Sequence, residues 1–173
     1  MDATQEGEKT NDDKSSTQRK QFLRNAYWGF ARSYDEKKQY QEAAKYWELA
    51  SQQQAGPPMV FFRIWRARSL MLDNMHDHGL ALLESLGNTN QMPLNFQYDF
   101  AAAAAAGFPP SVEAKALALA TLEQLAETNY FEQIQSGDYI PPKKRADFDG
   151  LRDEPAFVNL LEKLERQNET LSN

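Results

Sequence analysis

The residues best suited to metal chemistry lie in one short stretch around the only two histidines. His76 and His78 flank Asp77, and Asp73 lies just before them. Imidazole and carboxylate groups are common metal ligands. Residues two positions apart on an α-helix, however, point to different faces, so the stretch also fits a solvated turn followed by the start of a helix. We prefer that interpretation and expect no bound metal and no other cofactor.

A second group of acidic residues precedes the last predicted helix. Asp147, Asp149, Asp153 and Glu154 provide carboxylates, but a calcium loop needs ligands at regular alternate positions and a bidentate glutamate at its end. The run Asp147-x-Asp149-Gly150 departs from that pattern early. We therefore interpret these residues as acids at the start of a helix, where a negative charge is favourable.

Other catalytic chemistry has few residues to work with. The sequence contains no cysteine, no Gly-x-Ser-x-Gly motif and no glycine-rich phosphate loop. This excludes disulfides, thiolate metal sites and a cysteine nucleophile. An enzyme would have to work through carboxylates alone, and no spacing pairs them. We therefore predict that the protein is not an enzyme.

Charge and hydropathy limit the partners further. The net charge is −6, so a general basic surface for nucleic acid is not expected. No apolar run is long enough to span a membrane, and residues 1–20 lack the apolar core of a secretory signal. The short basic run from Pro141 to Arg145 is interpreted as an exposed loop. These features predict a cytoplasmic protein with no nucleic-acid or membrane partner.

The elements that would position a binding site are helices, and their spacing is clearest in the first third of the chain. Small and aromatic residues recur there at three- and four-residue steps, in the order Tyr27-x-x-Phe30-Ala31-x-x-Tyr34 and then Ala43-x-x-x-Trp47-x-x-Ala50. Such spacing puts the apolar side chains on one face of each helix. We expect two antiparallel helices over about residues 17–35 and 38–53.

This stretch resembles the tetratricopeptide repeat (TPR) family, whose repeat of about 34 residues is a helix–turn–helix. Tyr27 stands where the family has tryptophan, Ala31 stands where it has glycine, and Pro57 supplies the late proline. In a second repeat, Ala67 and Gly79 take the places of Ala31 and Ala43 at the same interval. A third repeat reads Tyr98-x-x-Ala101-Ala102-x-x-Ala105 within six consecutive alanines, and Ser111 is expected to cap its second helix.

The resemblance implies an all-α solenoid of about three TPR-like helix–turn–helix pairs with a C-terminal capping helix. The predicted helical domain covers residues 19–168, with repeats at about 24–57, 60–90 and 95–128 and a capping segment at 129–168. The last helix of that segment has apolar residues at helical spacing, and these are Phe157, Leu160, Leu161 and Leu164. Residues 1–18 contain almost no large apolar side chain, so we predict a disordered acidic and polar tail there.

The resemblance also implies a function, which is to bind an extended segment of a partner protein in a concave groove. In this family the first helix of each pair builds that groove, and the candidate residues here are Trp28, Arg32, Ile64, Arg68, Phe96 and Asp99. Some members grip a terminal carboxylate of chaperones with Lys, Asn and Arg, but the matching positions here are mainly aromatic. We expect a partner with apolar anchors and some acidic residues. Alternatively, Arg32 and Arg68 pair with acids on neighbouring helices.

Two other functions remain open. The run from Asp147 to Phe157, which reads Asp-x-Asp-x-Leu-Arg-Asp-x-Pro-x-Phe, is similar to the segment that closes many bacterial TPR arrays, including arrays attached to serine/threonine kinases. The chain has no kinase motif, so this similarity favours a regulatory companion of a larger enzyme. The other alternative is a helical protein that binds a small molecule in its groove.

Overall fold

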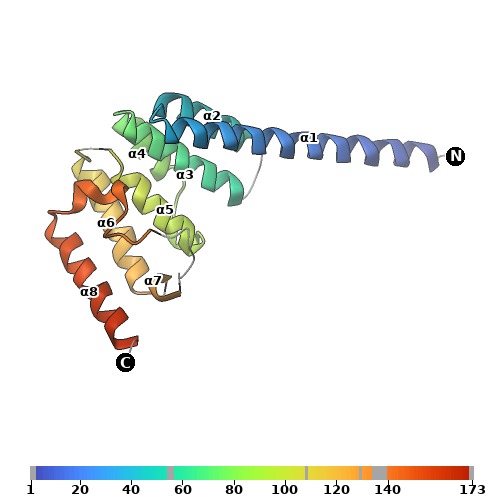
Figure 1. Cartoon of the computed structure of the whole chain (residues 1–173). Helices are drawn as coiled ribbons and strands as arrows, with labels where there is room; N and C mark the ends of the chain where they lie inside the picture. Colours follow the sequence, from blue (N-terminus) through green and yellow to red (C-terminus); the bar gives the residue numbers. More distant parts are fainter. Residues whose placement is uncertain (1–2, 54–56, 108, 129, 134–139, 172–173) are drawn as a thin grey trace. The chain divides into compact units, whose positions relative to one another are not determined.

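The computed structural model describes residues 3–53, 57–107, 109–128, 130–133 and 140–171, and that part of the chain is helical with no β-strand (Figure 1). The α-helices are α1 (Ala3–Glu36), α2 (Tyr40–Gln52), α3 (Pro57–Leu72), α4 (His76–Glu84), α5 (Leu94–Ala105), α6 (Val112–Ala126), α7 (Tyr130–Gln133) and α8 (Pro155–Leu171). Two short 3-10 helices are η1 (Thr89–Gln91) and η2 (Ala146–Leu151). The predicted all-α class is confirmed. The chain forms two compact units, residues 1–66 and 67–173.

Helix α1 begins earlier than the sequence predicted. It starts at Ala3, so residues 3–18, for which we predicted a disordered tail, are helical in the structure. Side chains 14–22 are all exposed, so burial does not explain this extension. Elongating a helix that a packed segment has already nucleated adds one hydrogen bond for each residue fixed. The residues of this segment include Ala, Glu, Lys and Gln, which are good helix formers.

The first unit is held together by small and aromatic side chains between α1, α2 and the first part of α3. Ala31, Ala43 and Ala50 are fully buried, which permits close approach of the helix backbones. The Trp47 ring fills the space beside them, with its centroid 6.1 Å from that of Phe62. The core predicted from the spacing is therefore present in this unit, except that Phe30, which the spacing places on the same face, is 53% exposed.

The turns that follow α1 and α3 have the same geometry. Lys38 and Asn74 take positive φ angles of 58° and 62°. Two backbone hydrogen bonds of 2.9–3.1 Å close each turn at matching offsets. In the first turn, the N–H groups of Lys38 and Gln39 donate to the carbonyls of Asp35 and Tyr34, respectively. In the second, the N–H groups of Asn74 and Met75 donate to the carbonyls of Met71 and Leu70, respectively. This is the Schellman arrangement that ends many helices, and it recurs after 36 residues.

In the second unit, a run of alanines on α5 provides the closest packing. The six residues from Ala101 to Ala106 are almost completely buried, as the prediction of a tightly packed helix requires. Helix α6 packs against α5, and it begins at the predicted cap, where the Ser111 hydroxyl accepts a hydrogen bond of 3.1 Å from the Ala114 N–H. Small side chains thus allow two helices to lie close together.

The C-terminal part of the second unit covers this helix pair. Helix α8 contacts α6, and η2 contacts α5. Of the four apolar residues predicted for α8, three are buried and Leu161 is half-buried. Phe148 and Leu151 of η2 are also fully buried. Part of the connection before η2, residues 134–139, lies outside the described residues.

Candidate functional site

The candidate groove residues of the first unit differ in exposure. Trp28 is 38% exposed on α1, and Arg32, one turn further along, is exposed and forms no salt bridge with another described residue. Ile64 on α3 is only 1% exposed, so its side chain belongs to the core. Trp28 and Arg32 are therefore the two candidates in this unit that present a surface.

In the second unit, two candidate residues are joined in a network of ion pairs, which we call the charge network. It consists of Arg68 on α3, Asp99 on α5, Asp147 on η2 and Arg145 just before η2. Arg68 and Arg145 both donate to the Asp147 carboxylate, at 2.8 and 2.9 Å. Arg145 also donates to Asp99 through two nitrogens at 3.1 Å. The alternative that Arg68 pairs with an acid is thus the one observed.

The charge network is shielded from water and lies against aromatic rings. The side chains of Arg145 and Asp147 are only 12% and 6% exposed. The Arg145 guanidinium lies 4.9 Å from the centre of the Tyr98 ring, a favourable cation–π arrangement. The Tyr98 hydroxyl donates a 2.6 Å hydrogen bond to the Ile140 carbonyl. These contacts attach the segment before η2 to α5.

Burial changes the acid–base behaviour of the groups around the network. Burial raises the pKa of Asp99, although the Arg145 charge opposes this. Burial alone would lower the pKa of Arg145, but the carboxylates of Asp147 and Asp99 raise it overall. Burial and the Asp99 charge raise the pKa of Tyr130 from its ordinary value of 10.0 to about 12. Residues with shifted pKa values mark some active sites. Here, however, each charged group of the network forms an ion pair that holds segments of the fold together.

The charge network differs from what the sequence predicts for two of its members. Arg145 was assigned to an exposed basic loop, and that assignment is wrong for Arg145, whereas its neighbours Lys143 and Lys144 are exposed. Asp147 was interpreted as an acid at the start of a helix; it does lie in the first turn of η2, but its main partners are Arg68 and Arg145. Arg68 lies 79 residues from Asp147 and Asp99 lies 46 residues from Arg145, so no local spacing indicates these two pairings.

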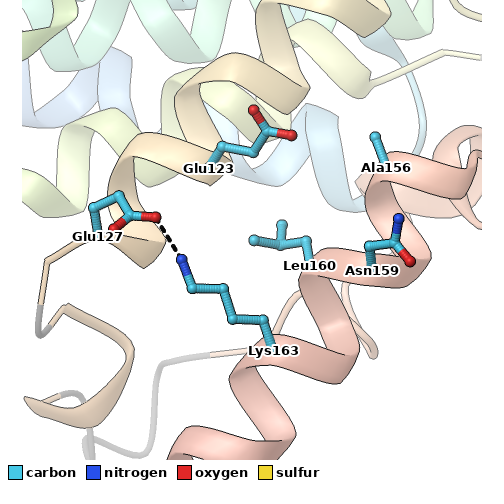
Figure 2. A pocket seen from close by; sticks show the side chains of 6 residues that line it. All are labelled: Glu123, Glu127, Ala156, Asn159, Leu160 and Lys163. Atoms are coloured by element: carbon cyan, nitrogen blue, oxygen red, sulfur yellow. Dashed lines mark hydrogen bonds and ion pairs between the residues drawn. The ribbon is translucent and has the colours of Figure 1, made fainter.

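A hollow of about 380 Å³ lies between α6 and α8 (Figure 2). Its lining residues are Glu123, Glu127, Ala156, Asn159, Leu160 and Lys163. Lys163 bridges the two helices by donating to Glu127 at 2.5 Å. Glu123, on the same helix as Glu127, is exposed to solvent. The hollow is open and mixed in charge, and no nucleophile lies beside a base in it.

A second hollow, of about 440 Å³, lies along α1 at the end of α2. Its lining residues are Ser15, Ser16, Arg19, Lys20, Leu23 and Gln53. None of them is acidic, so the two hollows have different electrostatic character. The first unit therefore combines an exposed tryptophan with a cationic hollow.

Metal and membrane sites were also sought in the described residues. No group of three or more His, Cys, Asp or Glu side chains gathers there as a metal site. His76 begins α4, and its buried Nδ1 has no hydrogen-bond partner among the described residues. None of the described helices combines the length and the apolar character that crossing a bilayer requires.

Comparisons of the chain with protein-family models, with curated proteins and with solved structures find no match.

Proposed function

We propose that this chain is a TPR-like helical repeat module that binds an extended segment of a protein partner and acts as a scaffold or adaptor. The observation that carries the proposal is the repeated turn. Lys38 and Asn74 occupy equivalent positions 36 residues apart, with φ angles within a few degrees and matching hydrogen bonds. Equal turns at a period of 20–50 residues are typical of repeat proteins, and such proteins use their extended surfaces for binding.

The small residues support the same period. Three pairs lie twelve residues apart, and these are Ala31 with Ala43, Ala67 with Gly79 and Ala102 with Ala114. The alanines of these pairs are at most 1% exposed. A Cβ atom added to Gly79 would lie 3.1 Å from the Ala67 carbonyl oxygen, so the backbones of α3 and α4 approach closely there. A solenoid of successive helix pairs is the arrangement that this repetition favours.

The binding surface that we propose is smaller than the groove expected from the sequence. Arg68 and Asp99 are engaged in the charge network, and Ile64 is buried. Trp28 and Arg32, four residues apart on α1, share one side of that helix. Arg pairs well with carboxylates and Trp supplies apolar area at binding sites, so these two residues fit a partner segment that carries both acidic and apolar side chains.

The run from Asp147 to Phe157 has a packing role that does not by itself favour the alternative of an enzyme companion. Phe148, Leu151 and Phe157 are fully buried, so the run is needed for packing whatever the chain is attached to. A cytoplasmic location belongs to the same proposal and agrees with the lack of cysteine.

The test is affinity capture from the native lysate with three versions of the chain. The unmodified chain should retain a partner, and a variant with Trp28→Ala and Arg32→Glu should lose it. Lys144→Glu, which makes the same charge reversal at an exposed position of the other unit, is the control and should retain it. Equal capture by all three versions would place the binding surface elsewhere.

A further inference from the structure

The hollow between α1 and the end of α2 is lined almost entirely by hydrogen-bond donors. Arg19 and Lys20 provide two positive charges, the hydroxyls of Ser15 and Ser16 can donate, and the side-chain amide of Gln53 can donate from α2. Leu23 is the one apolar lining residue, and no carboxylate lines the hollow. A concave site with these donors fits an anionic group.

The local charge strengthens this argument. Residues 14–24 include Lys14, Arg19, Lys20 and Arg24 and no acidic residue, although the whole chain has a net charge of −6. A positive stretch on an acidic protein attracts negative groups locally. Arg24 hydrogen-bonds to the Asn25 side chain at 2.9 Å, so Arg19 and Lys20, which line the hollow, are the cations that matter most for a ligand.

Exposed aromatic rings lie on the same helix as the cationic hollow. Phe22 and Phe30 on α1 are 73% and 53% exposed. They are eight residues apart, so they lie roughly 80° from each other around the helix, within one broad stripe. The Phe30 ring contacts α2, because its centroid lies 5.3 Å from the centroid of the Tyr46 ring on that helix. We call the surface formed by the hollow, Phe22, Phe30 and Tyr46 the α1–α2 seam.

We propose that the α1–α2 seam binds an acidic segment of a protein partner. A carboxylate of the segment pairs with Arg19 and Lys20 in the hollow, and an apolar side chain lies on Phe22 and Phe30. The inference rests on the proposed function as an interaction module and specifies the chemistry of a partner. It uses residues of α1 other than Trp28 and Arg32, which form the site proposed above.

A purely structural role predicts something else for the two cations. Positive side chains near a helix C-terminus interact favourably with its free carbonyl groups, and the hollow includes Gln53 at the C-terminal cap of α2. In that case, replacing Arg19 and Lys20 would lower the free energy of unfolding and leave peptide binding unchanged. Binding and stability therefore have to be measured on the same variants.

The experiment uses a fluorescent synthetic peptide that alternates glutamate with phenylalanine and leucine, titrated with the full chain and followed by anisotropy. Loss of charge-assisted hydrogen bonds should weaken binding about tenfold or more in a variant with Arg19→Gln and Lys20→Gln. The matched control, Lys37→Gln with Lys38→Gln, removes the same charge from exposed positions of the same unit and should stay within about twofold. Phe22→Ser should also weaken binding without a folding defect, because the ring is mostly exposed.

Three outcomes would overturn the proposal. These are no measurable binding to the unmodified chain, equal losses in the Arg19/Lys20 variant and its control, or unchanged affinity in the Phe22→Ser variant. If an oligonucleotide of the same length displaces the peptide equally well from the unmodified chain and from the Phe22→Ser variant, the hollow is a general polyanion site instead. Failure at the α1–α2 seam leaves the capture test with Trp28 and Arg32 unaffected, so the two proposals can fail separately.

Discussion

Asp147 accepts hydrogen bonds from two arginines that lie far apart in the sequence. Arg68 comes from α3 and Arg145 from the segment before η2, and Arg145 also reaches Asp99. Each charge of the network therefore has an opposite charge beside it. Removing one partner of a buried pair leaves an uncompensated charge and is much more costly than the pair itself is stabilising.

Replacing Arg145 by methionine tests the charge network. Arg145→Met leaves two carboxylates facing Arg68 alone, so the free energy of unfolding should fall by about 3–5 kcal/mol in a urea titration at neutral pH. Lys144→Met, at the exposed neighbouring residue, should change it by less than about 0.5 kcal/mol. If the two variants were equally stable, the network would not hold this segment in place.

Tyr130 gives the second unit a dependence on alkaline pH. Burial, helped by the Asp99 charge, raises its pKa from 10.0 to about 12. The unfolded chain therefore loses this proton at lower pH than the folded protein does. The free energy of unfolding should fall as the pH rises from about 10 to about 12, and Tyr130→Phe should remove that part of the decrease. Urea titrations at several pH values measure it, and identical slopes for both proteins would contradict it.

Elements with an apolar periodicity were predictable from the sequence, and elements without one were not. The helix pair around Ala31 and the cap at Ser111 follow from local spacing, because packing and capping use nearby residues. The first half of α1 has no apolar face, so the periodicity that marks a helix is missing there. The burial of Ile64 and the pairing of Arg145 with Asp99 depend on segments that are distant in the chain, and a single helix pattern contains no such information.

The close approach of α3 and α4 can be tested by overpacking. Ala67 is fully buried, and its carbonyl lies near Gly79. Ala67→Leu should therefore lower the free energy of unfolding by about 1–3 kcal/mol. Ala81→Leu adds the same volume at an exposed position of α4 and should be nearly neutral. A neutral Ala67→Leu would show that the second repeat is out of register with the first.

The N-terminal part of α1 should be dispensable for folding. Side chains 14–22 are exposed, and the core contacts of α1 lie further along, around Tyr27, Ala31 and Tyr34. Deleting residues 1–13 should reduce the helical circular dichroism signal but leave the thermal midpoint unchanged within error. A midpoint lowered by several degrees would mean that this segment docks on the rest of the chain.

For the molecule as a whole, each unit has its own buried core and each offers a different kind of surface. The first unit exposes aromatic rings and cations on α1, whereas in the second unit two of the candidate groove residues are neutralised by ion pairs. Recognition should therefore depend mainly on the first unit, and the second should contribute mainly stability. The repeated turns and small residues give both units the same local construction, which the proposed repeat module requires.

The most direct test of the binding claim is the salt dependence of affinity for a captured partner. For the unmodified chain, affinity should fall as salt rises, because Arg32 pairs with partner carboxylates on an exposed surface. Arg32→Glu should bind at least tenfold more weakly and lose that salt dependence, while its far-ultraviolet circular dichroism stays the same. A folded Arg32→Glu variant with the affinity and salt dependence of the unmodified chain would contradict the account.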